Sequence, residues 1–380
     1  MLKKPGFIRR FRFWSGLTVL SVYLLILVGG VVRATGSGMG CPDWPKCFGQ
    51  WVPPTQASQL PADYRQVYTA QRVAKNQKLA RTLERLGFKQ VAGNIFAHPT
   101  QYIETDFNAT KTWIEYVNRL LGALIGIFVF MTAVVALPYW QHDRPVFWLA
   151  VASWLLTGVQ GWLGSLVVST NLLPVMVTVH MGLALLIVAL LLYAAHRARY
   201  GHRELADLNE PAELEATGEQ LEDDALAVTA GARWLVGGLL LLSFVQITMG
   251  TQVREQVDLV AAANNYAQRP AWVAQLGSIF ESHRTLAALV VLANAVVGYW
   301  LWQLAEPAIQ QLVGLVGGLL ALEMAAGISL AYFGLPAWLQ PVHLTLATLL
   351  FGAQFLLLLA LRRLAASSQP ALVRVAAPSN

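Results

Sequence analysis

Three histidines lie near one end of apolar stretches, where a polar side chain needs a chemical reason. His180, His283 and His343 each fall within about one helical turn of the outward end of a hydrophobic run. Polar groups inside a bilayer are costly and usually functional. Neutral imidazole is a good axial ligand of haem iron, and facing helices of a bundle can offer one imidazole to each side of the ring. We therefore predict that His283 and His343 ligate a haem; the alternative is that each histidine only hydrogen-bonds to a neighbouring helix.

Four arginines accompany these positions at the same level. Arg119 directly follows Asn118, and Arg284 directly follows His283, which occupies the matching position in the second half of the chain. Arg33 and Arg254 close the first and fifth apolar runs. A guanidinium group suits a carboxylate bidentately. We therefore predict that the four arginines bind haem propionates; the alternative is that they are helix-end arginines whose side chains extend to water.

Two carboxylates differ between the two halves of the chain. Glu115 lies three residues before Asn118, so on a helix the two side chains share a face, whereas Glu281 lies only two residues before His283. A carboxylate beside a low-dielectric pocket can transfer protons, which makes Glu115 a candidate for proton transfer; the alternative is a helix N-terminal glutamate favoured by the helix dipole. Glu323, inside the seventh run, has no carboxylate copy in the first half and indicates only a helix-pairing or proton-path role.

The composition indicates an all-α polytopic membrane protein. The 380 residues are 56% hydrophobic and only 13% charged, against about 25% charged in soluble domains. Apolar runs near the roughly 20 residues that cross a bilayer must be helical, because only helices satisfy their own backbone in lipid. We expect eight transmembrane helices, near 15–34, 117–137, 147–168, 173–195, 232–252, 284–303, 308–331 and 341–361.

These helices form two copies of one plan. The first and fifth runs both end in G-x-x-V-R, and the fourth and eighth both open with V-H. From Asn118 to His180 is 62 positions, and from His283 to His343 is 60. Both copies begin on the same side, so they are parallel repeats related by an axis along the membrane normal. We therefore predict two pseudo-symmetric four-helix bundles.

The expected organisation follows from this repeat. We predict an N-terminal bundle over 1–196 that carries a long outer loop over 35–112, a cytoplasmic linker over 197–231, and a C-terminal bundle over 232–380. Within the outer loop, residues 64–87 predict an amphipathic helix. No soluble domain is expected.

Basic residues set the expected orientation. Lys and Arg cluster at the N-terminus, after the fourth run and at the end of the eighth, so both termini should be cytoplasmic. The first apolar run is a full span without a small-residue cleavage site, which argues against a signal peptide. The net charge of +6 is then mainly a topology signal, and no nucleic-acid partner is expected. We predict a multi-pass protein of the bacterial cytoplasmic (inner) membrane.

The two cysteines of the chain, Cys41 and Cys47, lie just outside the first span. Thiols on the outer face of a bacterial membrane are oxidised, so a short disulfide-closed loop is favoured. The alternative is a metal site, but zinc would need further ligands, and only Asp43 lies nearby.

With these residues in view, the chain resembles the haem A synthase family, membrane enzymes that oxidise haem O to haem A for cytochrome oxidase. The resemblance runs from the first span to the eighth. It rests on the motifs GGVVRATGSGMGCPDWPKCFG, IEYVNR, VHMG, ESHR and PVHL. The glycine-rich turn with C-P-D-W-P-x-C, followed by E-Y-x-x-R, is the most specific part.

The resemblance implies a division of labour. The C-terminal half would hold a haem b cofactor, with its iron bound by His283 and His343. The N-terminal half would bind the substrate haem through position 118 and His180, and Glu115 would act in catalysis. The reaction would convert the C8 methyl of haem O to a formyl group by successive oxygenations. The implied partners are a farnesylating haem O synthase, an electron donor and membrane lipid.

The family pattern also implies that Cys41 and Cys47 form an outer-loop disulfide. The chain departs from the pattern at Asn118, where the family motif has histidine. The substrate iron is then expected to be held by His180 alone, because one axial bond is easier to exchange than two. Met176 or Met181 could replace the missing ligand, or the site could have lost its activity.

Two other classes of function fit a haem scaffold. One is a b-type membrane cytochrome that only transfers electrons, and the other is a non-enzymatic haem carrier or oxidase assembly factor. The asymmetry between Glu115 and Glu281 favours the enzyme, since an electron carrier needs no special carboxylate in one half.

Overall fold

The computed structural model describes residues 6–96, 103–104, 106–170, 172–207 and 219–367. Over these residues the chain is helical and contains no β-strand beyond an isolated bridge between Cys47 and Gln50. Eight described helices are long and apolar enough to cross a membrane, which confirms the predicted fold class of a multi-pass all-α protein. They are α1 (Gly6–Ala34), α4 (Ala109–Val135), α6 (Arg144–Ser169), α7 (Pro174–Asp207), α8 (Glu219–Ala263), α9 (Ser278–Trp302), α10 (Pro307–Tyr332) and α11 (Leu339–Ser367).

Local signals explain several helix ends. The Asn108 side chain caps α4 by accepting a hydrogen bond from the Lys111 backbone N–H at 3.0 Å. Both α6 and α10 have a proline in the first turn, where no backbone N–H is needed. Gly36, just after α1, and Gly334, just after α10, have positive φ angles of 64° and 67°, which glycine adopts without strain.

Three helices extend past the apolar runs at the end opposite the long loop between α1 and α4. The first helix begins at Gly6 rather than near residue 15, because backbone hydrogen bonding continues through the basic segment. Likewise α7 continues to Asp207 and α8 begins at Glu219, so much of the predicted linker 197–231 is helical. The part of that linker over 208–218 lies outside the described residues.

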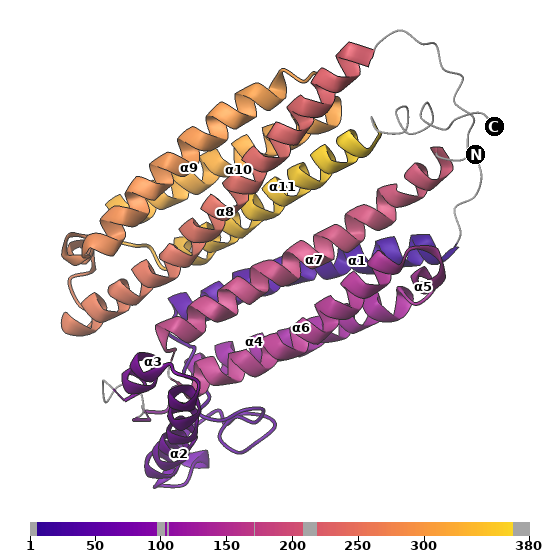
Figure 1. The fold of residues 1–380 in the computed structure, drawn as a ribbon. Helices are drawn as coiled ribbons and strands as arrows, with labels where there is room; N and C mark the ends of the chain where they lie inside the picture. The colour runs from indigo at the N-terminus through magenta and orange to yellow at the C-terminus, as the bar shows by residue number, and fades with distance from the viewer. Residues whose placement is uncertain (1–5, 97–102, 105, 171, 208–218, 368–380) are drawn as a thin grey trace.

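Each half arranges its four long helices in the same ring. In the first half, neighbours around the ring are α1, α4, α6 and α7; in the second half they are α8, α9, α10 and α11 (Figure 1). The repeated order leaves α4 diagonal to α7, and α9 diagonal to α11. The halves meet through α11, which packs against α1 and α7, and through contact between α7 and α8.

A close approach of backbones marks this junction. A Cβ at Gly30 of α1 would lie 2.8 Å from the Pro341 Cβ of α11, so only glycine fits without a shift. On the neighbouring pair of helices, the Thr178 and Thr251 hydroxyls are 2.7 Å apart and hydrogen-bonded. The junction is therefore tightly packed near the C-terminal end of α1.

A polar pair joins the diagonal helices of the second half below the histidines. The Gln354 amide donates to the Asn294 side-chain oxygen at 2.9 Å, and both side chains are buried. Each residue lies eleven positions beyond the histidine of its helix. The same offset in the first half reaches Val129 and Leu191, which belong to a buried apolar cluster. The two halves thus close the space below the histidine level with different chemistry.

Replacing one member of this pair is expected to destabilise the protein. Asn294→Val leaves the buried Gln354 amide without its acceptor, at a cost of about 1–3 kcal/mol. The double variant Asn294→Val/Gln354→Leu reproduces the apolar pair of the first half and should recover most of that loss. Thermal unfolding of the detergent-solubilised protein measures both; a double variant no more stable than the single one would contradict this account.

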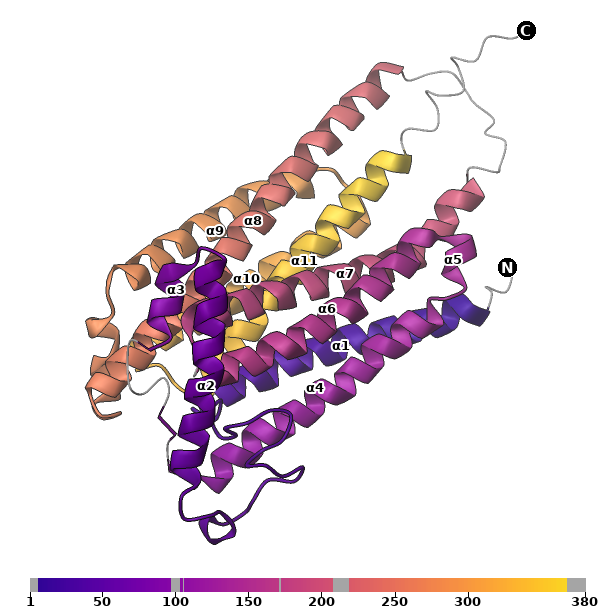
Figure 2. The same ribbon diagram turned by 60° about the horizontal axis from the view of Figure 1, so that its bottom comes forward.

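An outer cap sits over the first half. It contains η1 (Ala57–Gln59), α2 (Tyr64–Arg85) and α3 (Lys89–Asn94), and α2 confirms the helix predicted from residues 64–87. Figure 1 shows α2 and α3 beyond the ends of α4, α6 and α7, and Figure 2, with this end turned toward the viewer, shows them in front of the spans. Apolar residues of α2 and α3 pack with Leu173 and Met176 at the start of α7. The cap therefore covers the end of the helix that carries His180.

A buried ion pair stabilises the cap. Arg72 of α2 contacts Glu104 at 2.6 Å, and both side chains are almost fully buried. Burial raises the pKa of Glu104, and the charge of Arg72 and its hydrogen bond oppose that rise.

The remaining short helices lie in connections between spans. They are α5 (Tyr139–His142), η3 (Arg269–Ala271) and η4 (Val273–Gln275).

Candidate functional site

The three predicted histidine ligands share one packing arrangement. Each is the fifth to seventh residue of its helix, and its imidazole Cε1 faces a glycine of the adjacent helix. A Cβ built on the glycine would lie 3.2–3.5 Å from that carbon, so an alanine side chain would contact the ring. The pairs are His180 with Gly164, His283 with Gly250, and His343 with Gly327.

The fourth position of the repeat has no such ring. Asn118 occupies the site that matches His283, and Gly29 matches Gly250 in the G-x-x-V-R motif. A Cβ at Gly29 would meet nothing within 4 Å. The Asn118 side-chain oxygen is buried and has no hydrogen-bond partner. The shorter side chain therefore leaves the glycine uncovered.

A polar side chain lies one helical turn before each of the three covered glycines. The Gln160 amide donates to the His180 backbone carbonyl at 3.0 Å, and the Gln246 amide donates to the His283 carbonyl at 3.1 Å. Glu323 Oε1 lies 3.0 Å from His343 Nδ1, within ion-pair distance but without the angles of a hydrogen bond. Each histidine is therefore in contact with a polar group of its glycine helix.

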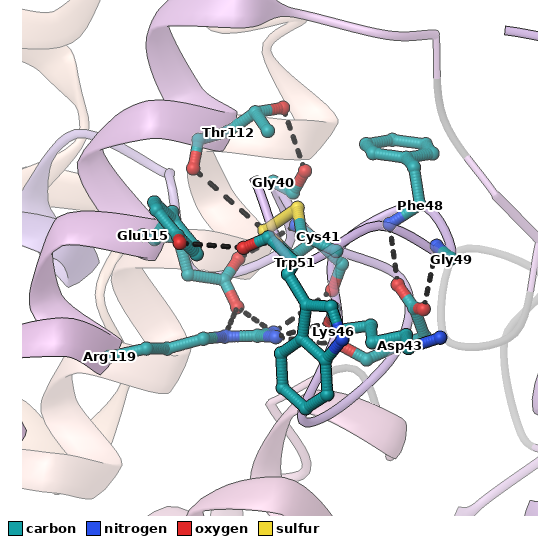
Figure 3. Close-up of a disulfide and its surroundings, with 12 residues drawn as sticks. Gly40, Cys41, Asp43, Lys46, Phe48, Gly49, Trp51, Thr112, Glu115 and Arg119 are labelled. Atoms are coloured by element: carbon teal, nitrogen blue, oxygen red, sulfur yellow. Dashed lines mark hydrogen bonds and ion pairs between the residues drawn. A yellow bond between two sulfur atoms is a disulfide. The ribbon is translucent and has the colours of Figure 1, made fainter. Parts of the chain in front are cut away.

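Glu115 is buried beneath the outer loop rather than exposed to an open space. Its Oε2 accepts a hydrogen bond from the Cys41 backbone N–H at 3.0 Å, and its Oε1 accepts from Arg119 Nε at 3.1 Å (Figure 3). A second guanidinium nitrogen of Arg119 bonds to the same oxygen. Both carboxylate oxygens therefore have protein donors, and the side chain is held in one position.

Arg119 connects that carboxylate to the loop. Its guanidinium donates to the carbonyls of Asp43 at 2.6 Å, Lys46 at 3.0 Å and Cys41 at 3.2 Å. All of these partners belong to the short loop or to α4. The predicted contact of Arg119 with a haem propionate stays a prediction, and the structure gives this guanidinium a set of protein acceptors.

The loop itself is closed by the Cys41–Cys47 disulfide, which confirms the favoured pairing. Both cysteines are fully buried. The Asp43 carboxylate, the one nearby candidate metal ligand, instead accepts hydrogen bonds from the Phe48 and Gly49 backbone N–H groups at 2.6 and 2.9 Å. Among the described residues no group of three His, Cys, Asp or Glu is arranged to hold a metal ion.

Removing the guanidinium from this loop is expected to be costly. Arg119→Leu leaves Glu115 as a buried carboxylate without its ion-pair partner, which destabilises proteins by about 3–5 kcal/mol. The matched control is Arg284→Leu at the equivalent repeat position, where the arginine is exposed and lies over the Phe280 ring. Thermal unfolding and limited proteolysis of the loop measure the difference; equal stability of the two variants would show that the Arg119 contacts do not hold the loop.

The other two predicted propionate ligands meet at the junction of the halves. Arg33 and Arg254 both pair with Asp258 of α8, the latter at 2.8 Å. Arg254 also donates to Gln340 Oε1 at 2.6 Å. In each arginine the Nε is buried and has no hydrogen-bond partner. The two arginines are thus brought together by one carboxylate that sequence reasoning did not single out.

Comparison with known proteins decides the family. Residues 12–89 and 89–355 match the COX15-CtaA family, described as a cytochrome oxidase assembly protein. The chain belongs to this family. The match includes the disulfide loop, Glu115 and the three histidines His180, His283 and His343.

Named relatives match this chain over part of their length. Proteins named "Heme A synthase" from Bradyrhizobium sp. and Rhodopseudomonas palustris are 26% identical over 287 and 326 residues, which is 72% and 78% of this chain and 68% and 72% of theirs. One of the same name from Shewanella oneidensis is 27% identical over 187 residues, 48% of this chain. The chain covers 44% of the length of that relative, so less than half of the protein is matched.

Within this family scaffold, sequence reasoning missed Gln160 and Gln246, and it singled out Glu323 without its histidine partner. Gln160 and Glu323 each lie 20 residues before the histidine that they contact, and all three partners precede a glycine by four positions. The pattern Q/E-x-x-x-G was therefore visible in the sequence. The two glutamines carry no charge, so neither charge nor metal-ligand chemistry pointed to them.

Proposed function

We propose that this chain is a haem A synthase, which oxidises the C8 methyl of haem O to a formyl group and so provides haem A for assembly of cytochrome oxidase. The observation that carries the proposal is the repeated seating of His180, His283 and His343 against glycines of adjacent helices in a member of this family. The names of its relatives agree with this activity.

The second half fits a resident haem b. His283 and His343 lie on the diagonal helices α9 and α11, with α8 and α10 between them on either side. The imidazole Nδ1 atoms of both are buried without a hydrogen-bond partner, apart from the Glu323 contact described above. A ligand imidazole binds iron through one nitrogen and donates a hydrogen bond from the other, so these side chains suit the group. When bound, haem b supplies one-electron transfer toward the substrate site.

The first half has the features of an exchangeable site. Its His180 is seated like the other two histidines, but the diagonal position carries Asn118, whose amide is a poor iron ligand. A single axial bond lets substrate and product leave more easily than two. The proposal therefore assigns the substrate haem to this half and makes His180 its protein ligand.

Glu115 is the proposed catalytic carboxylate of this half. Its helix also carries Asn118, and hydrogen bonds from Arg119 and Cys41 to its two oxygens fix its position. A fixed carboxylate near the reacting face can accept a proton that is released as the methyl group is oxidised. The disulfide loop would then serve to hold that carboxylate and to keep water away from it.

The arginines at the outer end give the haem carboxylates candidate partners. Arg284 is exposed beside Glu281 and Thr285 at the edge of a shallow hollow, while Arg33 and Arg254 share Asp258. Propionates of a haem bound near this end would lie where guanidinium groups are available. This assignment extends to Arg119 only if its loop contacts rearrange.

We further propose that the protein lies in the bacterial cytoplasmic membrane with both termini inside. Basic residues at the start of α1 and the ends of α7 and α11 lie at the end opposite the cap, as expected for the cytoplasmic side. The partners are then haem O, a haem O synthase that supplies it, an electron donor and membrane lipid. No nucleic-acid partner is proposed.

The haems that co-purify with the protein test this assignment. The chain, expressed in a host that makes haem O, should carry about one haem B together with haem O or haem A, identified by acid extraction and chromatography. Haem B alone at one per chain would support a b-type electron carrier instead. Bound haem that exchanges readily, with no conversion of haem O to haem A, would support a carrier or assembly factor.

A further inference from the structure

Each seated histidine contacts a pair of residues on the neighbouring helix, four positions apart. These seat pairs are Gln160 with Gly164, Gln246 with Gly250, and Glu323 with Gly327. The glycine gives room for the imidazole, and the polar side chain one turn earlier contacts the same residue. The arrangement recurs on α6, α8 and α10, so it is a property of the repeat and not of one helix.

The polar members leave acceptors free for the imidazole rings. Gln160 and Gln246 use their amide nitrogens on the histidine backbone carbonyls, and that of Gln246 also lies 3.4 Å from His283 Nε2, while their Oε1 atoms are buried and unbonded. The Nδ1 atoms of His180 and His283 are also buried and unbonded. In the third pair the acceptor oxygen of Glu323 already lies 3.0 Å from His343 Nδ1. Each seat therefore brings a polar side chain to its histidine, through the backbone carbonyl for Gln160 and Gln246 and through the imidazole Nδ1 for Glu323.

At the fourth position of the repeat, both the polar residue and the histidine are absent. Where the other three have a glutamine or glutamate four residues before the glycine, α1 has Leu25 before Gly29. The facing residue there is Asn118 and not histidine. A polar residue that served only helix packing would have no reason to disappear together with the histidine that it faces.

We infer that Gln160, Gln246 and Glu323 are positioning residues for the haem-ligating histidines, the two glutamines through the histidine backbone carbonyl and Glu323 through the imidazole Nδ1 that faces away from iron. This inference rests on the proposed haem binding. A hydrogen bond from the ligand imidazole fixes its tautomer and ring orientation and raises its basicity. The carboxylate at His343, in place of an amide, would make that ligand the most electron-donating of the three.

Two substitutions at Glu323 test the inference through haem b itself. Glu323→Gln gives α10 the amide found in the other two seats and should keep haem b, with a midpoint potential shifted in the positive direction. Glu323→Leu gives it the residue of the lost seat and should weaken haem b retention roughly 10- to 100-fold, the range for lost partners of metal ligands. Glu306→Gln, at the cytoplasmic start of the same helix, is the matched control and should change neither property.

Redox titration and haem quantification of the purified variants read out both effects. A Glu323→Gln potential equal to that of the unaltered protein would overturn the inference, as would full haem b retention at an unchanged potential in Glu323→Leu. If Glu323→Leu does not accumulate, the Glu323→Gln potential decides alone.

The glycine of the seat gives an independent check with a control in the other half. Gly327→Ala places a Cβ 3.2 Å from the His343 ring and should lower haem b retention, whereas Gly29→Ala meets nothing and should leave it unchanged. Equal haem b content in the two variants would count against the seat.

These measurements remain separate from the proposed function. Absence of haem b from the unaltered protein would refute the proposed haem binding, while haem b that is insensitive to residue 323 would refute only the positioning role.

Discussion

Replacing His343 with alanine is expected to remove nearly all haem b from the purified protein. The substitution deletes one of two proposed axial bonds and also empties the space that the imidazole fills beside Gly327. The described residues of α11 contain no second histidine, so no other imidazole of this helix can replace the bond. The reduced-minus-oxidised absorbance spectrum and the pyridine haemochrome of the purified variant measure the loss.

The control for this variant is His196→Ala on α7. That histidine packs against the Tyr200 ring, far along its helix from His180 and at the end opposite the cap. It should retain the haem b spectrum of the unaltered protein. An unchanged spectrum in the His343 variant would show that the ligand is assigned to the wrong residue.

Replacing Asn118 with histidine is expected to convert the exchangeable site into a retaining one. The new imidazole would face Gly29, where the structure leaves space, and would add a second axial bond to the substrate haem. An added contribution of about 1.4 kcal/mol raises retention about tenfold, so haem O or its oxidised products should accumulate in the purified protein while haem A output falls. Chromatography of extracted haems measures both quantities.

A matched pair of variants sharpens that experiment. The double substitution Leu25→Gln/Asn118→His rebuilds the complete fourth seat and should retain more substrate haem than Asn118→His alone. Leu25→Gln alone should have little effect, since it adds an acceptor without a ligand. If bound-haem composition is the same in all three variants, residue 118 does not face the iron.

Much of the fold follows from sequence because bilayer physics leaves few choices. Eight apolar runs had to be helices, and their repeated end motifs indicated two equivalent bundles. Boundaries were less predictable. The helices α1, α7 and α8 extend into charged segments because backbone hydrogen bonding does not stop where hydropathy falls.

The site was predictable in part. Histidine and glycine-rich motifs stood out by type and spacing, and the disulfide followed from compartment. The contact of Glu115 with Cys41 did not follow, because it depends on how a loop more than 70 residues away folds back onto α4. Asp258 was missed for a similar reason, since its importance lies in joining two arginines from different halves.

The asymmetry of the two halves connects these findings. One half keeps two seated histidines and a polar link between its diagonal helices through Asn294 and Gln354. The other half keeps one seated histidine, an apolar closure and a carboxylate locked to a disulfide loop. A permanent cofactor needs the first set of features, and a substrate that must enter, react and leave is better served by the second.

Haem A formation in membranes tests the central claim most directly. The chain is expressed with a haem O source in a host that lacks its own haem A synthase, and the membrane haems are extracted and separated by chromatography. The account predicts haem A in these membranes, and its loss when Glu115 is replaced by glutamine in a variant that still inserts and carries haem b. Haem O that accumulates unchanged in the presence of the unaltered, haem b-loaded protein would contradict it.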